Sequence, residues 1–367
     1  MNSTDLLKIV DKYIFVILII IFGFFVKLFS SSKKPKKIEK ILIIKLWAIG
    51  DSILTLPLIS QIRKKYPRAQ IDILSHKNNM IVYQNQKFID NRINLTFLNC
   101  FKLFKKYDVC IDTEPFMNQS AIISCYVSKK RIGFNHGIRK ILYTNTIKFD
   151  KTKHMVEMYF DMGKIIDVIQ DKSKKLIELK YSKSAEDKVN DILAKNKISK
   201  QDKLICFNPS VGASVKEREW PKENFKSLAE KILKSNKTTK IILVGIKSDY
   251  ELNEYIRNKN KNILNFSGKL NLEELFCFIK KTNLVISNDT GTMHISAAQG
   301  IKTIGLFGPN TPVIWAPYGE KNISLFHPKR GCPYLDNTKH NLVSKHLTEE
   351  QKTCMNAIKV EEVFQHI

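Results

Sequence analysis

The chain alternates between short, apolar segments and longer segments whose apolar residues have helical spacing. Residues Ile41–Leu46 form a nearly continuous apolar run, which is typical of a strand buried in a parallel sheet. A helix is predicted over Ser52–Tyr66, and Pro67 ends it. Similar patterns predict strands at Ile71–Leu74, Asn94–Leu98 and Val109–Ile111, and a short strand followed by a helix within Ile147–Gln170. This alternation indicates a parallel α/β sheet.

A second alternating unit follows a lysine-rich polar stretch, Ser173–Gln201, which contains a helical piece at Ala185–Ala194. The predicted strands are Leu204–Phe207, Ile241–Val244, Leu284–Ile286 and Thr303–Phe307, and the predicted helices are Lys222–Ser235, Leu272–Lys280 and His294–Gly300. The pattern predicts two tandem Rossmann-like, doubly wound α/β domains. Such sheets bind ligands outside the carboxyl ends of their strands, so we expect the site in a cleft between the domains.

The N-terminus has a different pattern. Residues Tyr13–Phe29 are almost wholly apolar, at the lower limit of about 17 residues for a membrane span. Lys33, Lys34, Lys36 and Lys37 follow, and the positive-inside rule keeps that side in the cytoplasm. We expect an uncleaved inner-membrane anchor with cytoplasmic catalytic domains. An interfacial helix and a cleaved signal peptide are the alternatives, and the weakly charged start of the chain argues against the signal peptide.

These patterns give four predicted regions. Residues 1–37 are the anchor and basic linker, and 38–182 are the first α/β domain. Residues 183–345 are the second α/β domain, and 346–367 are a C-terminal helical segment.

The formal net charge of +26, almost all of it from lysine, narrows the choice of partners. Nucleic acid, an anionic membrane surface and an anionic substrate all suit such a charge. No helix-turn-helix, zinc-finger or aromatic RNA-binding motif is present, which disfavours nucleic acid. Part of the charge is a solvated surface, and we assign the rest to a membrane or a phosphorylated acceptor. The seven cysteines include no Cys-x-x-Cys pair, which is typical of a reducing compartment.

The richest chemistry lies where the apolar segment Asn283–Ser287 runs into a small-residue helix. This junction carries Asp289, Thr290, Gly291 and His294. Backbone N–H groups at such a junction bind anions, so it suits the diphosphate of an activated sugar. A lone histidine is more often structural, but this one lies one helical turn after Thr290.

A second anion site is predicted after the strand that ends at Phe207. A turn with Gly212 and Ser214 precedes Arg218, and a glycine turn beside a cation can hold a phosphate. The alternative is structural, because a Trp-Pro pair such as Trp220-Pro221 often only packs against the first turn of the helix that follows it.

The turn after the first strand supplies a carboxylate. Gly50 allows the backbone to tighten, and Asp51 and Ser52 begin the next helix. Asp51 is either an N-cap or a base that takes a proton from an acceptor hydroxyl, and the two roles are compatible. We place Gly50 and Ser52 beside it on the acceptor side.

Several enzyme classes are disfavoured. No Gly-x-Gly-x-x-Gly follows a strand and no P-loop motif is present, which argues against nicotinamide, flavin and P-loop enzymes. No Asp-x-Asp pair is available to clamp a metal-bound diphosphate. We therefore expect no metal and no cofactor. Arg218 and helix N–H groups would neutralise the charge of the diphosphate in place of a metal ion.

Together these segments resemble glycosyltransferase family 9, the bacterial heptosyltransferases of lipopolysaccharide core assembly. The resemblance runs from about Lys40 to the C-terminus. It rests on four ordered stretches, which are Ile41–Pro57, Arg131–Phe134, Gly212–Pro221 and Asn288–Pro317. A closing segment at Cys354–Val363 also matches.

The resemblance implies a glycosyltransferase B fold and an inverting, metal-independent transfer. The donor, ADP-heptose, would bind the C-terminal domain. A phosphorylated lipid-linked saccharide would bind the N-terminal domain at the inner-membrane surface. The alternative is a catalytically inactive, membrane-tethered sugar-nucleotide-binding or scaffold protein, against which the retained Asp51 and Asp289 argue.

The resemblance also assigns roles to residues. Asp51 matches the family's proposed general base, and Arg218 matches a position where a lysine usually contacts the donor diphosphate. Asp289, Thr290, Gly291 and His294 match the donor-binding stretch, and Glu223 is a further candidate donor contact. Thr292 and Lys302 replace common prolines, and these departures leave the identity of the sugar open.

Overall fold

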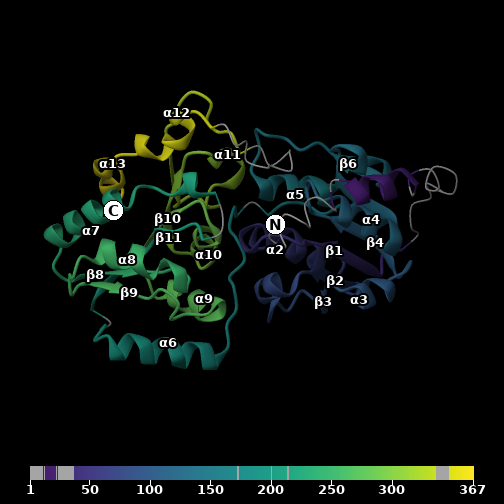
Figure 1. Cartoon of the computed structure of the whole chain (residues 1–367). Coiled ribbons are helices and arrows are strands. Elements are labelled where there is room, and N and C mark those ends of the chain that lie inside the picture. Colours follow the sequence, from purple (N-terminus) through teal and green to yellow (C-terminus); the bar gives the residue numbers. More distant parts are fainter. Residues whose placement is uncertain are drawn as a thin grey trace. The chain divides into compact units, whose positions relative to one another are not determined.

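The computed structural model describes residues 11, 13–21, 23, 37–171, 173–199, 201–212, 215–335 and 347–367. The chain divides into two compact units between Ser173 and Lys174, and residues 347–367 belong to the second unit (Figure 1). The sequence predicted a boundary after residue 182. The division comes earlier because the segment before that point already pairs with the second unit, where the Leu179 N–H donates to Gln299 Oε1 at 3.2 Å.

The first unit is built on a six-stranded parallel sheet with strand order β3-β2-β1-β4-β5-β6. Leu42 and Ile44 of β1 are fully buried in one apolar cluster with Leu103 and Val127. Its strands are β1 (Lys40–Ile44), β2 (Gln70–Ser75), β3 (Asn91–Asn94), β4 (Tyr107–Asp112), β5 (Ser128–Phe134) and β6 (Asn145–Ile147). Its helices are α2 (Ile49–Lys65), η1 (Lys77–Tyr83), α3 (Phe97–Phe101), α4 (Asn118–Val127), η2 (Ile138–Leu142) and α5 (Met155–Lys164).

The second unit repeats this plan with strand order β12-β11-β10-β7-β8-β9 and parallel pairing throughout. Its strands are β7 (Lys203–Asn208), β8 (Thr239–Leu243), β9 (Ile263–Asn265), β10 (Leu284–Asn288), β11 (Lys302–Phe307) and β12 (Ile323–Phe326). Its helices are α6 (Lys183–Lys195), η3 (Lys216–Arg218), α7 (Lys222–Ser235), η4 (Lys247–Asp249), α8 (Tyr250–Arg257), α9 (Leu272–Lys280), α10 (Gly291–Ala298), α11 (Pro312–Trp315), α12 (Glu349–Lys352), η5 (Cys354–Ala357) and α13 (Val360–Gln365).

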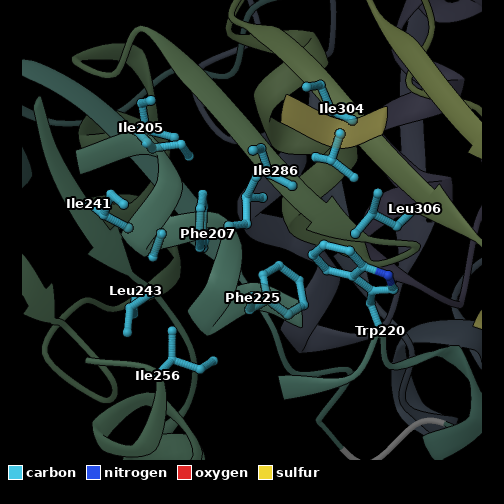
Figure 2. Packing of buried hydrophobic residues seen from close by; sticks show 14 of the residues in the cluster. Ile205, Phe207, Trp220, Phe225, Ile241, Leu243, Ile256, Ile286, Ile304 and Leu306 are labelled. Atoms are coloured by element: carbon cyan, nitrogen blue, oxygen red, sulfur yellow. The ribbon is translucent and has the colours of Figure 1, made fainter. Parts of the chain in front are cut away.

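One large core holds the second sheet to its helices. Phe207 and Ile286 of the sheet pack with Trp220 and with Phe225 of α7 (Figure 2). The C-terminal segment closes the same cluster, because Ile358 is fully buried in it and its carbonyl accepts a hydrogen bond from Trp220 Nε1 at 3.0 Å. The predicted C-terminal helical segment is therefore part of the second unit's core.

The two parallel α/β sheets are confirmed, but the strand predicted at Asn94–Leu98 is wrong. Strand β3 ends at Asn94, and Phe97 begins helix α3. Thr96 is the reason, because its Oγ1 accepts a hydrogen bond from Asn99 N at 3.2 Å and thereby caps the helix.

The structure does not support the predicted membrane anchor. Of the segment Tyr13–Phe29, only residues 13–21 and 23 are among those described, and they are helical. Over all the residues that the structure describes, no helix has the length and apolarity needed to cross a bilayer.

Candidate active site

Each sheet has one point at which the strand order reverses. In the first unit it lies between β1 and β4, and in the second between β7 and β10. Loops that leave neighbouring strands at such a point diverge and leave room for a ligand at the carboxyl edge. The residues that the sequence singled out follow β1, β7 and β10, and so lie at these two points.

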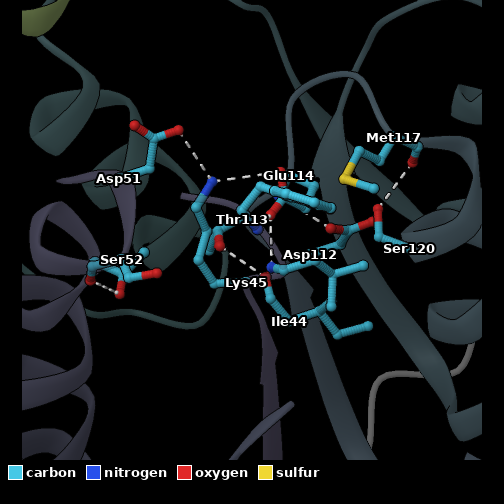
Figure 3. Close-up of polar contacts among 12 residues, drawn as sticks. Ile44, Lys45, Asp51, Ser52, Asp112, Thr113, Glu114, Met117 and Ser120 are labelled. Carbon is cyan, nitrogen blue, oxygen red and sulfur yellow. Dashed lines mark hydrogen bonds and ion pairs between the residues drawn. The ribbon is translucent and has the colours of Figure 1, made fainter. Parts of the chain in front are cut away.

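In the first unit, Asp51 lies in the first turn of α2. The N-cap interpretation is wrong, because Ala48 occupies the N-cap position and no side chain caps the helix. The Asp51 carboxylate instead lies 3.5 Å from Nζ of Lys45, the residue after β1, and its side chain is 29% exposed (Figure 3). A carboxylate in this position is oriented by a cation and still open to a ligand.

Lys45 is a buried cation between two carboxylates. Its side chain has no solvent exposure, and its Nζ also lies 3.3 Å from Glu114 Oε2 (Figure 3). Burial alone would lower the pKa of Lys45, but the negative charge of Glu114, with smaller contributions from neighbouring tyrosines and Asp51, raises it well above its ordinary value. Lys45 is therefore charged at every physiological pH.

Glu114 fixes the backbone that carries Asp51. It lies just after β4, and its Oε1 accepts hydrogen bonds from Leu46 N at 2.6 Å and Trp47 N at 2.9 Å. One carboxylate therefore holds both the turn after β1 and the ammonium of Lys45. This arrangement limits the movement of the turn relative to β4.

Gly50 and Ser52 flank Asp51, and both are buried. Ser52 has no solvent exposure, and its N–H donates to Ala48 O at 2.9 Å within the helix. Their assignment to the acceptor side stays a prediction, and their visible role is to pack the first turn of α2.

A second buried ion pair supports the end of β4. Arg139 Nη2 lies 2.7 Å from Asp112 Oδ2, and the Tyr143 hydroxyl donates to the same oxygen at 2.5 Å. Burial raises the pKa of Asp112, while Arg139 and Tyr143 oppose that change. Both charged side chains are almost completely buried, so this pair holds η2 against the sheet rather than meeting a ligand.

In the second unit, a polar network joins β7 to the start of α10. Asn208 Nδ2 donates to Thr290 Oγ1 at 2.8 Å, and Thr290 Oγ1 lies 3.2 Å from Ser287 Oγ. Asn288 Nδ2 donates to the Pro209 carbonyl at 2.6 Å and so ties the two loops together. The network fixes the N-terminus of the eight-residue helix α10, where backbone N–H groups attract anions.

Arg218 reaches this network from η3. Its guanidinium forms an ion pair with Asp289, whose Oδ2 also accepts a hydrogen bond from Asn310 Nδ2 at 2.8 Å. Asp289 is buried, whereas the Arg218 side chain is 21% exposed. The carboxylate therefore orients the cation, and the sequence-predicted residues Arg218, Asp289 and Thr290 meet at one edge of the second sheet.

Comparison with known proteins then decides the family. Residues 102–342 match the family model described as glycosyltransferase family 9 (heptosyltransferase). The chain belongs to glycosyltransferase family 9.

Individual relatives are distant but match over most of their length. The family 9 chain is 24% identical over 312 residues to lipooligosaccharide heptosyltransferase 2 of Haemophilus ducreyi, covering 78% of this chain and 88% of the relative. The crystal structure of a family 9 glycosyltransferase from Veillonella parvula superposes with a TM-score of 0.74 at 21% identity, covering 92% of this chain and 98% of that one. Escherichia coli heptosyltransferase WaaC with ADP-2-deoxy-2-fluoro heptose gives 0.64 at 16% identity, covering 89% and 98%. These structures share the fold.

The remaining donor-site predictions have different outcomes in this family 9 chain. Gly212 has a φ of +61°, a conformation that favours glycine, and its N–H donates to Ser210 Oγ at 2.9 Å. Ser214 lies outside the described residues. His294 is 4% exposed within α10, and its contact with the donor stays a prediction.

Sequence reasoning missed three residues that hold these sites together: Lys45, Glu114 and Asn310. A signal existed for Lys45, because a lysine that ends an apolar parallel strand needs a buried partner. Nothing local identifies Glu114 or Asn310, because their partners lie on other strands and loops. In the parts of the chain that the structure covers, no group of three His, Cys, Asp or Glu side chains could hold a metal ion.

Proposed function

We propose that this chain transfers a heptose from ADP-heptose to a phosphorylated, lipid-linked saccharide of the lipopolysaccharide core. Membership of a family described as heptosyltransferases is the observation that carries the proposal. The relative solved with an ADP-heptose analogue supports the choice of donor.

Asp51 is the proposed general base. Its carboxylate is part exposed at the carboxyl edge of β1, and the Lys45 ammonium at 3.5 Å orients it. Within hydrogen-bonding reach of an acceptor hydroxyl, it would accept the proton as the hydroxyl oxygen attacks the anomeric carbon. Glu114 acts through Lys45 and the backbone, so it is a positioning residue.

The second unit is the proposed donor-binding unit. Arg218 and the N–H groups that begin α10 would meet the diphosphate, whose negative charge grows as the bond to the sugar breaks. Asp289 would hold Arg218 in place rather than contact the diphosphate, because two anions repel. The Arg218 fork suits a diphosphate better than a point charge would.

The bond changes follow from these roles. The acceptor oxygen forms a bond to the anomeric carbon, and the bond from that carbon to the diphosphate oxygen breaks. ADP leaves with the electron pair, and the proton goes to Asp51. Attack opposite the leaving group inverts the anomeric configuration, and no metal ion is needed if Arg218 and α10 carry the charge of the leaving group.

We also propose that the reaction takes place at the cytoplasmic face of the inner membrane. The chain has 61 lysines and arginines but only 35 aspartates and glutamates. This excess of positive charge suits both a phosphorylated acceptor and an anionic membrane.

Substitution Asp51→Asn tests the catalytic role. Without the base, transfer from ADP-heptose to a truncated lipopolysaccharide acceptor is expected to fall by about 10²–10⁴-fold, while ADP affinity stays unchanged. The matched control is Asp187→Asn, an acidic residue near the start of α6 with a 60% exposed side chain, which should leave both quantities unchanged.

Each outcome separates the candidate functions. Near-normal turnover by Asp51→Asn removes Asp51 from the role of base. ADP binding without transfer by the unmodified chain, across a series of core acceptors, favours the inactive binding protein instead.

A further inference from the structure

The first unit exposes large apolar side chains on α3 and on Phe104, three residues after the end of this helix. Phe97, Leu98, Phe101 and Phe104 are between 61% and 84% exposed. Leu103 in the same segment is buried in the core, so the segment is held firmly while four neighbouring side chains face solvent. Isolated exposed apolar residues are ordinary, but a contiguous group of this size marks an interaction surface.

The N-terminal helical residues carry a second group of exposed apolar side chains. Ile19 is fully buried against α4 and η2, and the Asp11 carboxylate accepts hydrogen bonds from Asn118 N at 3.1 Å and Gln119 N at 2.9 Å. These contacts hold the helix along the side of the unit. Its other face exposes an apolar stripe of Tyr13, Ile14, Ile17, Ile20 and Ile21, each between 49% and 60% exposed.

A pocket joins the two exposed segments. It has a volume of about 540 Å³, and its lining includes Phe15 from the N-terminal helix, Phe97 and Phe101 from α3, and Tyr126 from α4. The Phe104 ring lies 4.9 Å from the ring of Tyr126 in this lining. We call this pocket, together with the exposed side chains of α3 and Phe104, the α3 surface of the first unit.

The α3 surface has a basic edge. The segment from Asn91 to Tyr107 contains Arg92, Lys102, Lys105 and Lys106 but no aspartate or glutamate. All three lysines are exposed, and Lys105 Nζ lies 5.9 Å from the centre of the Phe104 ring. Exposed aromatic residues with lysines beside them and no acidic residue complement an anionic lipid surface, where rings enter the interface and ammonium groups meet phosphates.

The α3 surface also approaches the loop that precedes the candidate base. His76 lines the same pocket, and its ring lies 5.2 Å from the ring of Trp47 in the turn that carries Asp51. A bilayer seated on the α3 surface would therefore lie beside this turn. A lipid-linked acceptor enters from such a bilayer.

We propose that the α3 surface docks the first unit on an anionic phospholipid bilayer, with the N-terminal helix lying in the interface. The benefit to the acceptor reaction rests on the proposed function, whereas the binding to lipid does not. Docking brings the turn that carries Asp51 to the depth of the lipid-linked saccharide.

The test is co-sedimentation of the full chain with vesicles of phosphatidylcholine alone or with one quarter phosphatidylglycerol. The full chain should bind the anionic vesicles, and added salt should weaken the binding. The double variant Phe97→Ser/Phe101→Ser should bind at least about tenfold more weakly, because two exposed rings that would enter the lipid are lost. A triple change to glutamine at Lys102, Lys105 and Lys106 should remove the preference for anionic vesicles.

Ile169→Ser is the matched control, because Ile169 is an isolated apolar residue of the first unit that is 80% exposed. It should bind vesicles like the unmodified chain. Failure of the unmodified chain to bind anionic vesicles, or equal binding by the Phe97/Phe101 variant, would overturn the proposal. A self-association that this variant abolishes, without vesicle binding, would assign the surface to a second copy of the chain.

Activity separates this proposal from the proposed function. With a deacylated, soluble acceptor, the Phe97/Phe101 variant should have unchanged kcat, while its KM for acceptor in vesicles should rise. If no acceptor is glycosylated but vesicle binding behaves as expected, the proposed function fails and the docking surface stands.

Discussion

At the scale of single residues, the candidate base depends on a buried ion pair. Lys45 has no solvent exposure, and its ammonium lies between Asp51 and Glu114. Removal of one partner from a buried pair leaves an uncompensated charge, which costs far more than the loss of a surface pair. The contact that orients Asp51 is therefore also a structural contact of the first unit.

Lys45→Met should lower the free energy of unfolding of the first unit by about 3–5 kcal/mol, because Glu114 would stay buried without its cation. Lys183→Met, which removes an ammonium from exposed pairs of α6, should change stability by less than about 1 kcal/mol. Urea unfolding measures both. Equal effects of the two substitutions would contradict the role given to the buried pair.

The same ion pair makes a prediction about pH. The pKa of Lys45 is raised above its ordinary value of 10.5, so its stabilising effect is fully present below that pH. The effect is lost as the pH rises through the folded-state pKa. The stability difference between the unmodified chain and Lys45→Met should stay constant from neutral pH to about pH 10 and shrink at higher pH. A difference that shrinks below pH 8 would show that another group dominates.

At the scale of elements, the C-terminal segment completes the core of the second unit. Ile358 is fully buried, and its carbonyl accepts the hydrogen bond from Trp220 Nε1. Trp220 lies between η3, which carries Arg218, and α7, and its backbone N–H donates to Asn288 Oδ1 at 3.1 Å. Packing of the C-terminus therefore reaches the loops of the proposed donor site.

Ile358→Ala should destabilise the second unit by about 2–5 kcal/mol, because it leaves a cavity beside Trp220. Val360→Ala, at a partly buried position of the same segment, should cost less. Urea unfolding followed by tryptophan fluorescence gives both values. If Ile358→Ala were as mild as Val360→Ala, the segment would be an appendage and not part of the core.

The elements also show why the sequence predicts some segments better than others. Helices α7 and α9 have their predicted bounds, because Pro221 precedes α7 and a capping box of Asn271 and Glu274 begins α9. These are local signals. The apolar Phe97-Leu98 pair suggested a strand, but Thr96 caps a helix there and both side chains are exposed. The strand prediction assumed that apolar runs are buried, and the α3 surface, which we propose to meet a bilayer, does not follow that rule.

At the scale of the whole molecule, two similar sheets carry different chemistry. The first places a part-exposed carboxylate at its reversal point, and the second places a cation and a helix N-terminus. The sequence predicted Asp51, Arg218 and Thr290, because glycine turns and strand ends mark them. It could not predict Glu114 or Asn310, because tertiary pairing alone brings them to the site.

This division of chemistry predicts which unit responds to the donor nucleotide. A ligand at 100 times its Kd stabilises the unit that binds it by about 2.7 kcal/mol. ADP should therefore raise the unfolding midpoint of the second unit alone. The three tryptophans separate the signals, because Trp47 lies in the first unit and Trp220 and Trp315 lie in the second. Trp47→Phe leaves a probe of the second unit only.

The shift should persist in EDTA, because Arg218 and the start of α10 are proposed to meet the diphosphate without a metal ion. Arg218→Ala should reduce it, whereas Lys216→Ala, an exposed neighbour in η3, should not. A shift that vanishes in EDTA and returns with Mg²⁺ would overturn the metal-free proposal. A shift confined to the first unit would overturn the assignment of the donor site, because the residues proposed to bind the diphosphate at the end of β10 would then have no part in holding the nucleotide.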